Sequence, residues 1–93
     1  MSRTESGRNG RYEARVPGHD EAGELTYSKR GDDVVIAKHT GVPKALRGNG
    51  IATRLVERLI ADARAEKFTV VPLCPFVAAL FEQHPEWHDL EAT

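Results

Sequence analysis

The stretch from residue 46 to residue 63, LRGNGIATRLVERLIADA, indicates the fold more clearly than any other part of the chain. Two glycines stand directly before a run whose apolar residues recur at the i, i+3, i+4 spacing of an amphipathic helix. Glycines let the backbone approach a ligand, and the free N–H groups and dipole of a helix start attract phosphate. The alternative is a turn that serves only to enter the helix. The apolar positions are Ile51, Ala52, Leu55, Val56, Leu59, Ile60 and Ala63.

Strand-like patterns lie on both sides of this helix. Residues 11–16 alternate between polar and apolar, as do residues 24–28, so we expect two antiparallel strands. Residues 34–37, VVIA, are apolar on both faces, which is typical of a central strand. Residues 68–73 form a strand after the helix, and this predicts a right-handed parallel crossover. With a last helix that begins at Pro75, the expected fold is α+β, in the order β-β-β-α-β-α around a mixed sheet.

The first ten residues, MSRTESGRNG, are rich in Ser, Gly and Arg and offer almost no apolar surface. Such a segment gains too little from burial to offset the entropy lost on ordering. The sequence therefore predicts a flexible tail over residues 1–10 and a single domain over residues 11–93.

Charge and cysteine content restrict the partners and the compartment. Thirteen Lys and Arg against fourteen Asp and Glu give a net charge of -1, which supplies no basic field for nucleic acid or an anionic membrane. We expect neither partner. Cys74 is the single cysteine, and the N-terminus lacks the apolar stretch of a signal peptide, so a cytoplasmic protein is expected. We predict no metal site, because Pro85 ends the helix between His84 and His88.

Several motifs, taken in order, resemble those of one protein family. The pattern RxxGxA, formed here by Arg47, Gly50 and Ala52, resembles the acetyl-CoA pyrophosphate loop of the GCN5-related N-acetyltransferases. The wider set resembles the very small branch of that superfamily, whose members are little more than the cofactor-binding core. The resemblance covers about residues 11 to 90. Its motifs are His39-Thr40, Val42-Pro43, Leu46 to Ala52, Val70 to Val77 and His84-Pro85.

This resemblance implies a fold and a cofactor site. The strands ending at Thr40 and Leu73 would be two parallel strands that splay apart and leave a V-shaped cleft for the pantetheine arm of acetyl-CoA. Backbone groups near Thr40 and Val42 would pair with that arm as a further strand would. The pyrophosphate would be held by a set of backbone amides with the Arg47 side chain beside them. These amides belong to Gly48, Asn49, Gly50, Ile51 and Ala52.

The chain departs from the superfamily at two positions that bear on catalysis. Larger members often place a tyrosine on the final helix to protonate the departing CoA thiolate, and here the matching residue is Phe81. The branch often carries Glu or a larger residue at the position of Gly41. His39 then remains as a candidate base, with a structural hydrogen bond as its alternative role. Cys74, expected near a helix N-terminus, is a candidate proton donor or acetyl acceptor, or else a packing residue.

The sequence therefore predicts an acetyl-CoA-dependent N-acetyltransferase. It would move an acetyl group to an amine, with a protein or peptide lysine as one candidate, by direct attack in a ternary complex. The alternative is a non-catalytic module that binds CoA or an acyl-CoA and acts through a protein partner. A chain this small leaves little material for an acceptor pocket, so we expect an acceptor lying across an open face or a site completed by a dimer. The expected oligomeric state is a monomer or a weak homodimer.

Overall fold

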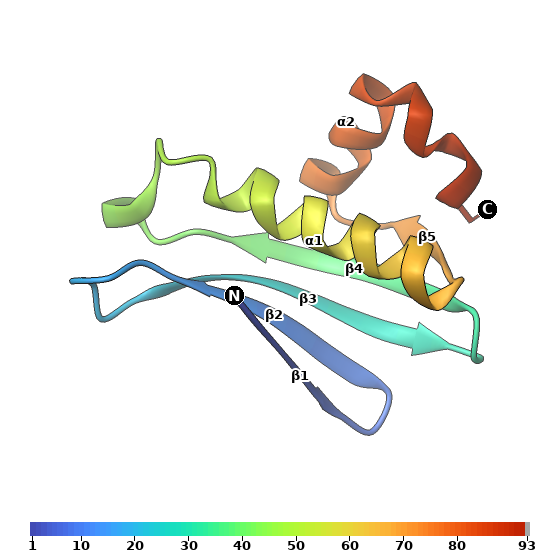
Figure 1. Cartoon of the computed structure of the whole chain (residues 1–93), viewed down its shortest axis with the longest axis horizontal. Helices are drawn as coiled ribbons and strands as arrows, with labels where there is room; N and C mark the ends of the chain where they lie inside the picture. The colour runs from blue at the N-terminus through green and yellow to red at the C-terminus, as the bar shows by residue number, and fades with distance from the viewer. Residues whose placement is uncertain (93) are drawn as a thin grey trace.

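The computed structural model describes residues 1–92, which form one five-stranded sheet with two α-helices (Figure 1). The strands lie side by side in chain order, β1 to β5. Neighbouring strands are antiparallel except β4 and β5, which are parallel. The elements are β1 (Ser2–Ser6), β2 (Asn9–Arg15), β3 (Ala22–Arg30), β4 (Val34–Gly41), η1 (Lys44–Leu46), α1 (Ile51–Glu66), β5 (Thr69–Pro72), α2 (Pro75–Gln83) and η2 (Pro85–Leu90).

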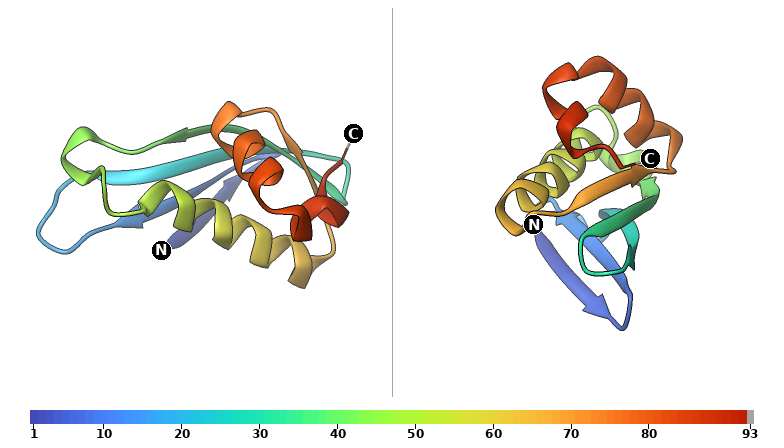
Figure 2. Two further views of the ribbon diagram at one scale, coloured as in Figure 1. Left: turned by 90° about the horizontal axis from the view of Figure 1, so that it is seen from above. Right: turned by 90° about the vertical axis from the view of Figure 1, so that its right-hand side faces the viewer.

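Helix α1 joins the two parallel strands and lies against one face of the sheet (Figure 2). It begins after Gly50 and ends at Glu66. The next residue, Lys67, has a left-handed backbone (φ 61°), and its N–H closes the last turn by donating to the Ala63 carbonyl. The buried side chains recur every three or four residues, as the sequence predicts. They are Ile51, Leu55, Val56, Leu59, Ile60 and Ala63.

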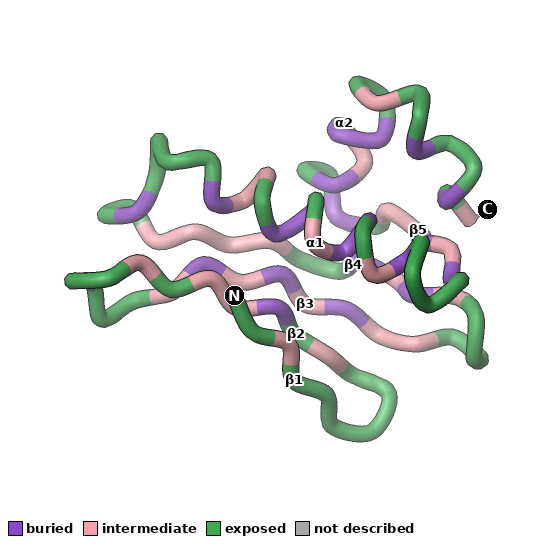
Figure 3. Tube along the Cα trace, in the orientation of Figure 1, coloured by how far each residue is buried: buried purple, intermediate pink, exposed green. Residues whose placement is uncertain are grey.

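Buried and partly exposed residues alternate along β3 (Figure 3), so this part of the sheet has one dry face and one open face. On β3 the side chains of Leu25 and Tyr27 are fully buried toward α1, whereas the alternate residues Glu24, Thr26 and Ser28 remain partly exposed. A period of two is what a strand covered on one side produces. We use the term open face for the side that carries these three residues and their neighbours Arg11 and Glu13 on β2.

The predicted fold class is confirmed, including the parallel pair around a crossover helix. The C-terminus adds structure that the sequence did not predict. Beyond Pro85 the chain forms η2, which buries Trp87 and Leu90. The next residues cover the outer edge of β5, where the Ala92 N–H donates to the Val70 carbonyl at 2.7 Å. This contact satisfies backbone groups that an edge strand otherwise exposes.

The prediction of a flexible tail over residues 1–10 is wrong, because Ser2–Ser6 form strand β1 and Asn9 begins β2. The physical reason is Arg3, whose side chain is only 17% exposed. Its guanidinium forms ion pairs with Glu5 at 3.1 Å and Asp62 at 3.2 Å, and with Glu66. Polar interactions with α1 thus replace the apolar burial that this segment lacks.

Tyr27 completes the attachment of β1. Its hydroxyl receives a hydrogen bond from Arg3 Nε at 2.9 Å and donates one to Glu5. The ring reaches this point only because Gly10 has no side chain, since a Cβ there would lie 2.1 Å from the Tyr27 ring. Lys29 and Tyr27 lower the pKa of Glu5 to about 2, so this carboxylate stays charged at neutral pH.

If Arg3 anchors β1, Arg3→Ala should lower the free energy of unfolding by about 1–3 kcal/mol, because three carboxylates lose a partner. For a domain of this size that corresponds to a melting temperature lower by about 4–8 °C per kcal/mol. Arg8→Ala, at an exposed position in the β1–β2 turn, is the matched control. Thermal unfolding followed by circular dichroism measures the two melting temperatures. Equal values for Arg3→Ala and Arg8→Ala would contradict the anchoring of β1 by Arg3.

Candidate functional site

A β-bulge in β4 shapes the candidate site. Along β3, Thr26 pairs with His39 and the next residue, Tyr27, pairs with Ala37. Lys38 lies between these two partners and is therefore an extra residue in β4. A bulge bends its strand and increases the local twist. Beyond the bulge, β4 remains paired with β3 and is no longer paired with β5.

The two parallel strands separate just beyond this bulge. Residues 34–37 of β4 pair with residues 69–72 of β5, and the last link is the Cys74 N–H, which donates to the Ala37 carbonyl at 2.9 Å. Beyond the bulge, residues 39–41 of β4 pair with β3 alone. We use the term wedge for the place where β4 and the chain after β5 part, with its apex at Ala37 and Cys74.

Cys74 lies at this apex and directly before α2. The thiol is 5% exposed, and Sγ lies 3.6 Å from the Thr40 hydroxyl oxygen. Burial alone would raise the pKa of Cys74, but the N–H groups of Val77 and Phe76 and the Thr40 side chain favour the thiolate. The net effect lowers the pKa of Cys74 below its ordinary value. The structure therefore brings Thr40 and Cys74 together from two strands, a contact that no sequence signal predicted.

His39 lies on the opposite side of β4 from that contact. It pairs with Thr26, so its exposed side chain shares the open face, whereas the next residue, Thr40, pairs with the buried Leu25. The imidazole leans over Gly41, where a built Cβ would lie 3.1 Å from Nε2. The two candidate catalytic residues, His39 and Cys74, consequently flank β4 from different sides.

The glycine-rich loop leads into α1 as the sequence predicts. Gly48 and Gly50 both have positive φ, 88° and 70°, and a side chain at either position would point into open space. The first helical hydrogen bond runs from the Arg54 N–H to the Gly50 carbonyl, so the N–H groups of Ile51 and Ala52 precede the helical ladder. The first turn of α1 carries no acidic residue. Backbone donors and the helix dipole together give this end the chemistry that favours an anion.

Asn49 and Arg47, two further predicted residues of the loop, donate side-chain hydrogen bonds to backbone carbonyls. Asn49 Nδ2 donates to the Leu46 carbonyl at 3.1 Å and so holds the turn in shape. Arg47 is exposed, and its Nε donates to the Val42 carbonyl at 3.3 Å. This contact links the loop to the end of β4, so Arg47 and Val42, both predicted site residues, are neighbours.

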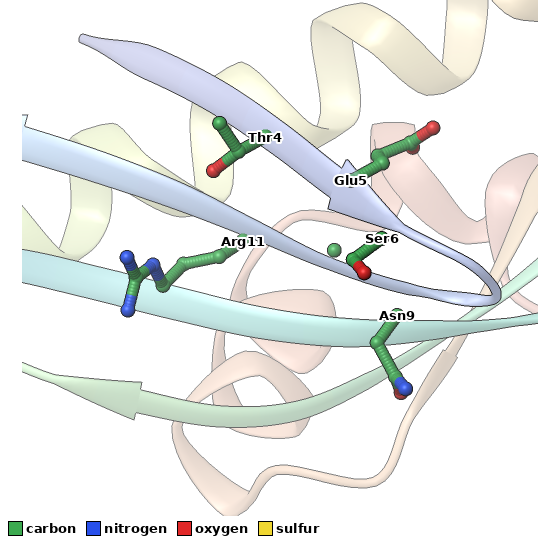
Figure 4. A pocket seen from close by; sticks show the side chains of 6 residues that line it. Thr4, Glu5, Ser6, Asn9 and Arg11 are labelled. Carbon is green, nitrogen blue, oxygen red and sulfur yellow. The ribbon is translucent and has the colours of Figure 1, made fainter.

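Three surface depressions lie outside the wedge. One, of about 750 Å³, adjoins η1 just before the loop and is lined by Glu21, Pro43, Lys44 and Ala45. Another, of about 330 Å³, lies where the end of α1 meets β5 and η2. The third, of about 290 Å³, lies at the β1–β2 hairpin (Figure 4). Its lining is Thr4, Glu5, Ser6, Asn9, Gly10 and Arg11. None of the three is lined by His39 or Cys74.

Three further observations on the described residues concern the packing of Phe81, groups that could bind a metal ion, and helices that could span a membrane. Phe81 is 1% exposed and packs edge-to-face on Trp87, with ring centroids 5.8 Å apart. Residues 1–92 contain no group of three or more His, Cys, Asp or Glu side chains suited to a metal ion. Within the same residues, no helix has the length and apolar character needed to cross a membrane.

Comparisons with known proteins agree with this geometry. A family model described as GCN5-related N-acetyl-transferase matches residues 11–90. Among solved structures, the chain is similar to a GCN5-like protein from Staphylococcus aureus determined by NMR in solution, with a TM-score of 0.68. The match covers 98% of this chain and 87% of the other at 19% identity, so it concerns the fold alone. Comparison with curated protein sequences gives no match.

The matched family segment runs from β2 to the end of η2. It includes the bulged strand β4, the glycine-rich loop, α1 and the parallel strand β5, which are the elements that build the wedge. The chain belongs to the GCN5-related N-acetyltransferase family.

Proposed function

We propose that the protein is an N-acetyltransferase that uses acetyl-CoA and transfers the acetyl group directly to an amine in a ternary complex. The observation that carries this proposal is the wedge between β4 and β5 together with an anion-binding loop at the start of α1. An extended molecule with a phosphate at one end and a thioester at the other matches these two features.

The donor groups of the chain fit the phosphate end. Amides of Gly48, Asn49, Gly50, Ile51 and Ala52 would bind the pyrophosphate of acetyl-CoA, and no carboxylate in the first turn of α1 opposes it. Each hydrogen bond to a charged group contributes about 1.5–3 kcal/mol, so a few of them account for micromolar affinity. The Arg47 guanidinium lies in the same loop and adds a positive charge.

The thioester end fits the wedge. The edge of residues 38–41 that faces away from β3 has no strand partner, so backbone groups near Thr40 and Val42 would pair with the pantetheine arm. The Val42 carbonyl, which accepts a hydrogen bond from Arg47, would exchange that contact on binding. Acetyl-CoA supplies an activated acyl group with a thiolate leaving group. The chain then has to orient the amine, accept its proton and assist departure of the sulfur.

His39 and Cys74 would carry out these two proton transfers, and their positions on different sides of β4 support this assignment. In the proposed reaction, the amine nitrogen bonds to the acetyl carbon and its proton passes to the His39 imidazole directly or through water. The carbon–sulfur bond breaks, and the departing sulfur accepts the proton of the Cys74 thiol, which solvent later replaces. Phe81 has no hydroxyl and cannot take the second role.

The second candidate function is a module that binds CoA or an acyl-CoA without turnover and acts through a protein partner. Gly41 carries no carboxylate and Phe81 no hydroxyl, which is the observation in its favour. A protein lysine as the acceptor, a monomeric or weakly dimeric state and a cytoplasmic location likewise remain predictions. Turnover of acetyl-CoA with a panel of amines and peptides separates the two functions.

Cofactor binding should be visible as thermal stabilisation. Acetyl-CoA at about 100 times its dissociation constant stabilises the fold by roughly 2.7 kcal/mol, which raises the melting temperature by about ten degrees or more in a chain this small. Gly50→Glu should remove this shift, because it adds a carboxylate to the anion-binding loop. Gly7→Glu is the control, since Gly7 also has a positive φ and open space around its Cα. Absence of any shift in the unmodified protein would refute cofactor binding.

The role of His39 predicts a particular pH dependence. The imidazole accepts a proton only in its neutral form, so the rate of acetyl transfer should fall toward acid pH. His39→Gln should lose this limb and lower the rate by about 10²-fold or more, the usual contribution of a general base. Steady-state rates between pH 5 and 9 test this, with the acetyl-CoA thermal shift confirming that the variant is folded. An unchanged rate and profile would assign His39 a structural role.

The hydrogen-bond donors around Cys74 predict a thiol with a pKa below that of a free cysteine. The thiol therefore deprotonates at lower pH than an unstructured one, and Thr40→Val should move this titration back upward by removing the hydroxyl that favours the thiolate. Thiolate absorbance near 240 nm reports on Cys74 alone, because the chain has one cysteine. Cys74→Ser provides the blank. A titration that Thr40→Val leaves unmoved would contradict this assignment.

A further inference from the structure

Strand β1 lies at the outer edge of the sheet. Among residues 1–92 it pairs with β2 on one side and has no strand partner on the other (Figure 1). An edge strand presents unpaired N–H and C=O groups, which can pair with a strand of another chain. Charged side chains on an edge oppose such pairing, and β1 carries two, Arg3 and Glu5. The strand that fits beside β1 therefore depends on the order of these charges.

The β1–β2 turn determines which residues of β1 direct their backbone groups outward. Ser6 pairs with Asn9 across a two-residue turn that begins with Gly7 at φ 61°, as in a type II′ hairpin. The Ser6 carbonyl accepts from the Asn9 N–H in such a turn, so these two residues form a hydrogen-bonded pair. Hydrogen-bonded and non-hydrogen-bonded pairs alternate along antiparallel strands. Arg3 and Glu5 therefore direct their N–H and C=O groups to the free edge.

The sequence of β1, SRTES, has opposite charges at equal distances from its central residue, Thr4. A second copy can lie antiparallel to the first with its own Thr4 opposite this one. Arg3 of each copy is then opposite Glu5 of the other, and opposite charges directly across two strands stabilise their pairing. Each of these pairs would also exchange both of its N–H···O bonds, because both residues direct them outward.

The other antiparallel registers are unfavourable. A shift of two residues places Glu5 opposite Glu5 of the second copy in one direction, and Arg3 opposite Arg3 in the other. Like charges directly opposite each other destabilise a strand pair. A shift of one residue places Arg3 or Glu5 opposite Thr4, whose backbone groups point toward β2, so the ladder cannot form. The charges that oppose foreign strands at this edge thus favour one register with a second copy of the chain.

Helix α1 leaves room for this arrangement. Arg3 and Glu5 both reach the Tyr27 hydroxyl, so their side chains lie on the face that α1 covers. A two-fold axis perpendicular to the sheet keeps the α1 helices of both copies on this face. Since α1 contacts β2 and β3, the two helices would lie about four strand spacings, or roughly 19 Å, apart. A helix with its side chains is about 10–12 Å wide, so the two do not collide.

We propose that β1 is a homodimerisation edge, at which two copies pair antiparallel through Ser2–Ser6 around a two-fold axis at Thr4 and join their sheets into one. The inference is independent of the proposed function, because β1 and the wedge lie at opposite sides of the sheet. Strands of five residues bury less area than the roughly 1,200 Å² of a stable complex, so the association is weak and concentration-dependent.

The test is sedimentation velocity over protein concentrations up to the millimolar range, in which the unmodified protein should show a monomer–dimer equilibrium. Thr4→Asp should weaken association by about fivefold or more, because two carboxylates then lie directly opposite each other across the axis. In the monomer the new carboxylate faces Arg11, so the fold is retained. Ser6→Asp is the matched control, since it faces Ser2 of the second copy, and it should change association by less than about twofold.

A charge swap tests the position of the axis. Thr4→Lys should also weaken association, whereas an equimolar mixture of Thr4→Asp and Thr4→Lys should associate at least as well as the unmodified protein, because opposite charges then meet. Thermal unfolding of each variant confirms that it is folded.

A disulfide can capture a weak dimer. In a Cys74→Ser background, Thr4→Cys would place two thiols at a non-hydrogen-bonded pair, whose Cα atoms lie about 4.5 Å apart, within the range of a disulfide. Mild oxidation should link the two copies. Ser6→Cys should remain unlinked, because the two thiols would be four residues out of register, or roughly 13 Å apart.

A monomer at every concentration, with no linkage through Thr4→Cys, would overturn the proposal. Equal weakening of a dimer by Thr4→Asp and Ser6→Asp would also overturn it, since such a dimer would use another surface, such as the open face. The acetyl-CoA thermal shift should be the same in Thr4→Asp as in the unmodified protein. Its absence from both would refute the proposed function, and sedimentation would still report on β1.

Discussion

The hydrogen bond from the Cys74 N–H to the Ala37 carbonyl is the contact on which the site geometry depends. It is the last link between β4 and β5, and it fixes the start of α2 against the middle of β4. Before it, the two strands share a regular parallel ladder; after it, the Lys38 bulge turns β4 away. Because the ladder ends here, the thiol of Cys74 lies against the Thr40 hydroxyl as well as the first N–H groups of α2. A wedge with unpaired backbone on one side follows from this single point of separation.

Helix α1 covers one face of β2 and β3, and this leaves the other face of these strands exposed. A helix can cover only one face of these strands, and α1 buries Leu25, Tyr27 and Tyr12 on that side. The other face keeps the polar residues of β2 and β3 and, after the bulge, His39. Among residues 1–92, no second layer covers these side chains. The chemistry we propose uses both sides of β4, with the thiol at the dry side and the amine at the open side.

The N-terminal hairpin shows how a small sheet is completed without a larger apolar core. Strand β1 is polar and mostly exposed, and it is held by the charges of Arg3 and Glu5 and by the hydroxyl of Tyr27. Burial and the hydrogen bond to Glu5 raise the pKa of Tyr27 to about 12, so the phenol remains a donor at neutral pH. Gly10 is required because the Tyr27 ring crosses β2 at that residue. This network lies at the β1 edge of the sheet, at the opposite side from the wedge between β4 and β5.

The sequence by itself determined the parts that depend on neighbours in the chain. Helix α1 follows from apolar residues three and four apart, the loop before it from its two glycines, and the parallel pair from a strand on each side of that helix. Only the tertiary structure decided strand β1, the bulge at Lys38, the Thr40–Cys74 contact and the pairing of Glu24 with Gly41. These features join residues 17 to 63 positions apart or depend on the register between strands. Local periodicity fixes which face a side chain takes but not which residue of the neighbouring strand it pairs with, because a two-residue shift of register keeps every side chain on the same face.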